Sequence, residues 1–99
     1  MSYKLTFHPL AEKEYVESVV WYEKNRTGLG VQFIEEIENL LDHIEQNPFL
    51  FPRKKGGFRE APLKIFPYVI VYAVTRKGRQ ISVLSIFHTS RNPVLKYNR

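Results

Sequence analysis

The feature that most limits the fold is one long amphipathic pattern placed ahead of several strand patterns. Between about Leu29 and Gln46, apolar residues recur three and four positions apart, which predicts a helix with one buried face. Asn47-Pro48 ends this helix, because the residue before a proline disfavours helical geometry. The pattern consists of Phe33, Ile34, Ile37, Leu40, Leu41 and Ile44.

A shorter helix and a strand are expected before it. Tyr3–Phe7 alternates apolar and polar residues, as a half-buried strand does. Pro9 fits the first turn of a helix that ends near residues 25–27, with His8 as its cap. The short Gly28-Leu29-Gly30 turn then predicts an antiparallel pair of helices. Trp21, on the first helix, is expected in the core, the alternative being an exposed recognition residue.

Three strands are expected after the helices. Phe58–Ile65 is interrupted by Pro62, which confines it to an edge or a bulge. Tyr68–Thr75 is apolar on both faces and is expected at the centre of the sheet, next to Gln80–His88. Gly78 is expected to take a positive φ in the intervening turn.

This order, β-α-α-β-β-β, indicates an α+β fold in which a helical hairpin packs on one face of a small antiparallel sheet. The 99 residues suffice for a single domain, 1–99, with residues 92–99 as a loosely held tail. The chain has no cysteine, no signal-peptide pattern and no apolar run of membrane-spanning length, so a cytoplasmic location is expected.

Charge is divided unequally along the chain. Residues 1–50 contain four basic and nine acidic residues, a net charge of −5, whereas residues 51–99 contain eleven basic residues and one acid, Glu60, a net charge of +10. A basic half of this strength suits nucleic acid, an acidic protein, or both, and the alternative is a merely solvated surface.

The sequence has few patterns that would indicate a nucleotide, metal or cofactor site. A phosphate-binding glycine loop is missing, and the three histidines, His8, His43 and His88, lack metal-ligand spacing, so no metal and no cofactor is expected. His43 is expected on the surface. Tyr68 and Tyr72 are expected in the core, the alternative being base stacking.

The basic residues of the C-terminal half therefore form the candidate site. We expect antiparallel strands to bring them together at one end of the sheet, where cations position a phosphodiester and His88 acts as acid or base. The alternative is a binding surface without catalysis. The members are Arg53, Lys54, Lys55, Arg59, Lys64, His88 and Arg91.

Taken together, the motifs resemble the RelE/ParE family of type II toxin–antitoxin toxins. They are Ala11-x-x-Glu14, Trp21-Tyr22-Glu23, Gly28-Leu29-Gly30-x-x-Phe33, Ile44-x-x-Asn47-Pro48, Arg59, Phe66-Pro67-Tyr68-x-Ile70-x-Tyr72 and Ile86-Phe87-His88-x-x-Arg91-x-Pro93. The resemblance implies a growth-inhibiting, plasmid-stabilising toxin. It also implies a neighbouring gene for an acidic antitoxin, through which the complex contacts operator DNA.

Two branches of the family differ in target. ParE-like toxins poison DNA gyrase, and the C-terminal His88-x-x-Arg91-x-Pro93 together with Trp21-Tyr22 is more similar to that branch. RelE-like toxins cleave mRNA in the ribosome, without metal. A non-toxic nucleic-acid- or protein-binding relative is the third alternative.

The resemblance also implies site residues for each branch. In the RelE-like alternative, Arg59, His88 and Arg91 are catalytic, with Lys54 or Lys55 beside them. His88 then replaces the family's C-terminal tyrosine, since nothing is expected to fix Tyr97 in a site. Antitoxin or target contacts are expected at Arg53, Lys54, Lys55, Arg59, Lys64 and Arg91.

Overall fold

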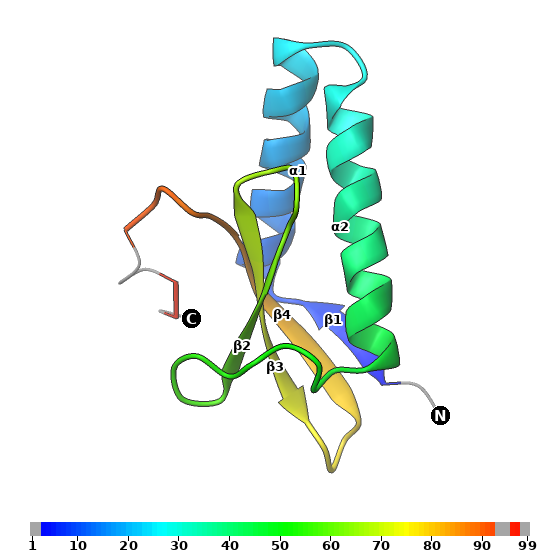
Figure 1. Cartoon of the computed structure of the whole chain (residues 1–99), viewed down its shortest axis with the longest axis vertical. Helices are drawn as coiled ribbons and strands as arrows, with labels where there is room; N and C mark the ends of the chain where they lie inside the picture. The colour runs from blue at the N-terminus through cyan, green and yellow to red at the C-terminus, as the bar shows by residue number, and fades with distance from the viewer. Residues whose placement is uncertain (1–2, 93–95, 98–99) are drawn as a thin grey trace.

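The computed structural model describes residues 3–92 and 96–97 and confirms the α+β order (Figure 1). Its elements are β1 (Lys4–Phe7), α1 (Pro9–Asn25), α2 (Leu29–Gln46), β2 (Phe58–Pro62), β3 (Tyr68–Thr75) and β4 (Gln80–His88). The two helices form the predicted antiparallel hairpin, and the sheet packs against one side of it. Within the described residues, no helix is long and apolar enough to cross a membrane.

The sheet has the strand order β1-β4-β3-β2, so β3 is an inner strand as predicted. β2, β3 and β4 are antiparallel neighbours, but β1 lies parallel to β4. The prediction of an antiparallel sheet is therefore wrong for this one pair, and the sheet is mixed. A tight turn forces antiparallel neighbours, whereas β1 and β4 are joined through the rest of the domain, which leaves their relative direction unconstrained.

Aromatic side chains fill the space between helices and sheet. Phe33 is fully buried, and its ring lies 5.0 Å from those of Phe66 and Tyr68 and 5.2 Å from that of Tyr22. Trp21, expected in the core, is instead 57% exposed. Successive helical residues point about 100° apart, so the inward direction of Tyr22 turns Trp21 out to the surface.

The turn between the helices is held by a carboxylate. The Glu23 side chain accepts hydrogen bonds from the backbone N–H groups of Gly28 and Gly30, at 3.0 Å each for the shorter contacts. These donors belong to the free N-terminus of α2, where a negative charge is favourable. Gly28 has a φ of 91°, and a Cβ on Gly30 would lie 2.9 Å from the carbonyl oxygen of Val19.

We expect Gly30→Ala to lower the free energy of unfolding by about 1–2 kcal/mol, because the methyl group would push α1 and α2 apart. Alanine gains helix propensity of about 1 kcal/mol over glycine, which offsets part of this loss. Urea unfolding measures the difference. Gln32→Ala, at an exposed position of the same helix, is the control and should change stability little; equal stability in both variants would contradict the close-contact explanation.

The β3–β4 turn differs from expectation in one backbone detail. The positive φ falls on Arg79, at 49°, and not on Gly78. The Arg79 N–H bonds to the Arg76 carbonyl (3.2 Å), and its carbonyl accepts from the Lys4 N–H (2.8 Å). The turn is thereby tied to the start of β1.

Candidate functional site

The predicted cationic cluster is divided between the two ends of the sheet. Arg59 on β2 pairs with Tyr72, whereas His88 on β4 pairs with Tyr68, four residues earlier in β3. At about 3.4 Å per residue, these positions are roughly 14 Å apart along the sheet. The expectation that the strands bring Arg59 beside His88 and Arg91 is therefore wrong. Strand register, which the sequence does not specify, decides this separation.

Arg59 is engaged in holding the loop that follows α2. Its guanidinium donates to the Phe51 carbonyl at 2.6 Å and lies 5.2 Å from the centre of the Phe49 ring. Beside it, the buried Tyr72 hydroxyl donates to the Pro48 carbonyl at 2.9 Å. Burial raises the pKa of Tyr72 to about 12, although the charge of Arg59 acts to lower it. These contacts describe a structural anchor for residues 48–51, and Tyr72 is in the core as predicted.

At the opposite end of the sheet, a small hollow of about 190 Å³ lies between α1 and β4. Glu14 organises it: one carboxylate oxygen accepts from the Ser85 hydroxyl (3.0 Å) and the Ile86 N–H (3.1 Å), and the other from the Arg91 guanidinium (2.7 Å). The hollow is lined by Glu14, Glu17, Ser18, Trp21, Tyr68, Ile86, His88 and Arg91. It thus presents an exposed indole beside an imidazole and an arginine.

The orientation of His88 follows from its neighbours. Its Nδ1 accepts the Ser90 N–H at 3.1 Å, and its ring meets that of Tyr68 edge-on at 4.9 Å. A nitrogen that accepts a hydrogen bond carries no proton, so the neutral ring holds its proton on Nε2. His88 is therefore arranged as an Nε2–H donor. His8 caps α1 as predicted, through a 3.1 Å bond from the Leu10 N–H, and His43 is exposed as predicted.

The sheet face away from the helices carries the C-terminal contacts. Glu60, the single acid of the basic half, accepts from the Tyr97 hydroxyl and lies 3.3 Å from the Lys96 ammonium. The Tyr97 ring also lies 5.2 Å from that of Phe58. The expectation that nothing fixes Tyr97 is wrong. Burial, with the hydrogen bond and charge of Glu60, raises the pKa of Tyr97 to about 12, which disfavours its use as a base. The rest of the predicted tail, residues 93–95 and 98–99, lies outside the described residues.

Sequence reasoning missed part of the positive charge at the Arg59 end. The predicted cations of the 53–55 loop lie near the β3–β4 turn and the start of β1, at the lower end of Figure 1. That turn holds three cations in four residues, a pattern that predicts a turn and not a binding surface. We call this surface the basic end. Its members, all exposed, are Lys4, Arg53, Lys54, Lys55, Arg76, Lys77 and Arg79.

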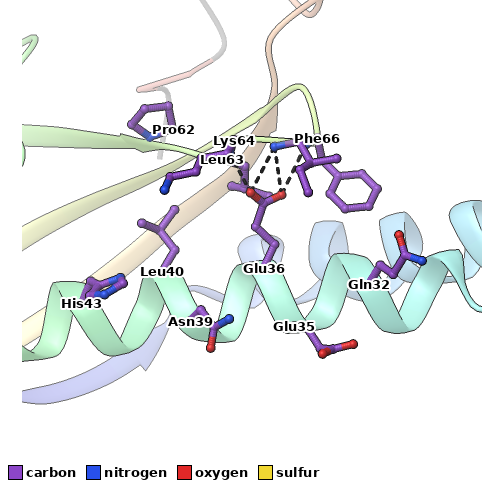
Figure 2. Close-up of a pocket in the computed structure, with 11 residues that line it drawn as sticks. Gln32, Glu35, Glu36, Asn39, Leu40, His43, Pro62, Leu63, Lys64 and Phe66 are labelled. Carbon is purple, nitrogen blue, oxygen red and sulfur yellow. Dashed lines mark hydrogen bonds between the residues drawn. The ribbon is translucent and has the colours of Figure 1, made fainter.

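A larger groove, of about 530 Å³, runs between α2 and the β2–β3 connection (Figure 2). The Glu36 carboxylate accepts from the backbone N–H groups of Lys64, Ile65 and Phe66, at 2.7–3.3 Å, and so fixes the connection against α2. Lys64, a predicted contact residue, is exposed on the rim of this groove, away from the basic end. No group of three or more metal-ligating side chains occurs in the part of the chain that the structure describes.

A protein-family model and several solved structures are similar to this chain over most of its length. A family model described as the ParE toxin of type II toxin-antitoxin system, parDE, matches residues 5–93. The chromosomal ParDE system of P. aeruginosa contains a similar chain, with a TM-score of 0.76 and 16% identity over 89% of this chain and 97% of that one. The isolated E. coli RelE toxin has a TM-score of 0.68 and 21% identity over 97% and 94%.

A mutant E. coli RelE in complex with the antitoxin peptide RelBc is similar as well, with a TM-score of 0.69 and 20% identity over 100% of this chain and 96% of that chain. At these identities the solved structures show a shared fold. No curated protein sequence matches the chain.

Proposed function

The chain belongs to the ParE toxin family of type II toxin–antitoxin systems, and from this premise we propose that it is a cytoplasmic toxin that inhibits DNA gyrase by binding. The observation that carries the proposal against RNA cleavage is the separation of the cationic groups. A metal-free nuclease requires its cations and its acid or base around one phosphodiester. Here Arg59 and His88 lie on either side of β3 and four residue positions apart along it. The guanidinium groups of Arg59 and Arg91 are engaged by Phe51 and Glu14.

The hollow between α1 and β4 is the surface that we propose for the target protein. Exposed tryptophan and arginine side chains contribute more than other residues to the binding energy of protein interfaces. Trp21 lines this hollow, beside His88 and the ion-paired Arg91. The Trp21 ring is positioned by an edge-on contact with Tyr22 at 5.1 Å, so little conformational freedom is lost when a partner covers it.

We expect Trp21→Ala to raise the toxin concentration needed for half-inhibition of supercoiling by roughly thirtyfold, the loss of a typical interface hot spot. Its free energy of unfolding should change by less than about 1 kcal/mol, since the side chain is 57% exposed. The measurement is a supercoiling assay with gyrase from the source organism. Val16→Ala, at a similarly exposed position of α1 outside the hollow, is the control and should inhibit like the unchanged toxin.

The same assay distinguishes the ribonuclease alternative. Unchanged supercoiling at saturating toxin, together with cleavage of a translated message that is lost in Arg59→Ala or His88→Ala, would replace the gyrase proposal by the RelE-like one. Intact messages in cells whose growth has stopped would support gyrase inhibition.

We also propose that an acidic segment of a cognate antitoxin neutralises the toxin. The support is the net charge of +10 on residues 51–99 and the structure of a similar RelE in complex with an antitoxin peptide. An exposed cation is better suited to such a contact than a cation already held by another group, because it forms a new ion pair without breaking an existing interaction. Lys64, exposed on the rim of the groove along α2, is thus better placed than Arg59 and Arg91.

A further inference from the structure

We propose that the basic end is a binding surface for the phosphodiester backbone of duplex DNA, used by the toxin itself. The basic end brings together seven cations from three separate segments. The backbone bond between Lys4 and Arg79 joins two of these segments, and the Arg53–Arg59 bridge holds the third beside β2. This surface is separate from the hollow proposed for the target protein, and the inference does not depend on gyrase inhibition.

The cations of the basic end are available to a ligand. Ion pairs between described residues are made by Arg91 and Lys96, neither of which belongs to this surface. The surface extends across the sheet from β1 to β2, three interstrand spacings, or about 14 Å. Duplex DNA carries one charge per about 1.7 Å of its axis, so a strip of this width faces several phosphates at once.

The aromatic residues of this end favour a duplex over a single strand. Proteins that bind single strands stack the bases on exposed aromatic rings. Phe49 is instead half-buried and is covered by the guanidinium groups of Arg76 (4.2 Å) and Arg59 (5.2 Å), and its ring is nearly perpendicular to that of Tyr3. The Phe49 ring therefore orients Arg76 and is not free to stack on a nucleic-acid base.

An acidic peptide, such as an antitoxin segment, is the rival occupant. Peptides bind through apolar anchor positions in a groove or through addition to a strand edge. The hollow beside Trp21 and the groove along α2, the two concave surfaces described above, lie away from the basic end. The basic end has lysine and arginine side chains and lies outside both concave surfaces, which matches a phosphate backbone better.

The test is fluorescence anisotropy of the purified full-length toxin with a short duplex DNA of arbitrary sequence, over a range of salt concentrations. We expect the triple variant Arg76→Gln, Lys77→Gln, Arg79→Gln to bind roughly tenfold more weakly. The salt slope, which is the steepness of the fall of log K with log salt concentration, should be reduced by about 2–3. The pair Lys54→Gln, Lys55→Gln, in a different loop, should reduce the slope by about 2, which guards against a local folding defect in the turn.

The control removes the same net charge from the helical hairpin, away from the basic end: Lys13→Gln, Lys24→Gln, Arg26→Gln, all at exposed positions. It should bind DNA within about twofold of the unchanged toxin. Equal weakening in the control and the triple variant would overturn the proposal, as would absence of binding by the unchanged toxin. Tighter binding of single-stranded RNA or of polyglutamate through the same residues would assign the surface to the rival ligand. Because no gyrase is present, these outcomes are independent of the supercoiling assay.

Discussion

We expect Phe33→Ala to lower the free energy of unfolding by about 3–5 kcal/mol, the largest effect of any single substitution considered for this chain. The Phe33 side chain has no exposed surface and contacts the rings of Tyr15, Tyr22, Phe66 and Tyr68. Its truncation leaves a cavity at the point where α1, α2 and the β2–β3 connection meet. A domain of this size has about 5–15 kcal/mol of stability, so the variant would be close to unfolding.

Urea unfolding monitored by circular dichroism measures this loss. Ile34→Ala is the matched control, since it truncates the next residue of α2, whose side chain is 37% exposed. Its free energy of unfolding should fall by about 1 kcal/mol or less. Phe33→Leu fills part of the cavity and should fall between the two. Similar stability of the Phe33 and Ile34 alanine variants would contradict the assignment of Phe33 to the centre of the core.

Glu14→Ala is expected to lower the free energy of unfolding by about 2–4 kcal/mol, because it leaves two hydrogen-bond donors without their acceptor. The Ser85 hydroxyl belongs to a residue that is 1% exposed, and the Ile86 N–H faces the side of β4 beyond the end of β1. Buried donors that lose a charged acceptor incur the full cost of desolvation. The ion pair with Arg91, whose side chain is 39% exposed, adds little.

Thermal and urea unfolding of two further variants separates these contributions. Glu14→Gln retains an oxygen acceptor and loses only the charge, so it should cost less than the alanine variant. Glu17→Ala removes an exposed carboxylate from the next turn of α1 and should leave stability within about 0.5 kcal/mol. A loss in Glu17→Ala as large as that in Glu14→Ala would indicate a general effect of charge on the helix.

Glu14 also shows why the sequence interpretation of the site was incomplete. The Ala11-x-x-Glu14 motif supported the family resemblance, yet nothing near Glu14 in the sequence indicated its partners. Those partners are 71 to 77 residues away along the chain. The same holds for Tyr97, whose contact with Glu60 spans 37 residues, and for Lys4, whose place at the basic end depends on the Arg79 carbonyl.

The sequence by itself determined the helices and strands and their order. The repeat of apolar residues in 29–46, the stop at Asn47-Pro48 and the apolar run 68–75 are set by neighbours in the chain, and the structure has these elements at the predicted bounds. It also determined the charge of the C-terminal half. Local periodicity and local charge require no knowledge of what a segment packs against.

Only the tertiary structure decided where that charge is located. The register of β2, β3 and β4 placed Arg59 four residue positions along the sheet from His88. The parallel pairing of β1 brought Lys4 beside the β3–β4 turn. Register and strand direction result from the simultaneous packing of all layers, because a one-residue slip would reverse the buried and exposed faces of a strand. Two separate surfaces, and not a single cationic site, are the consequence.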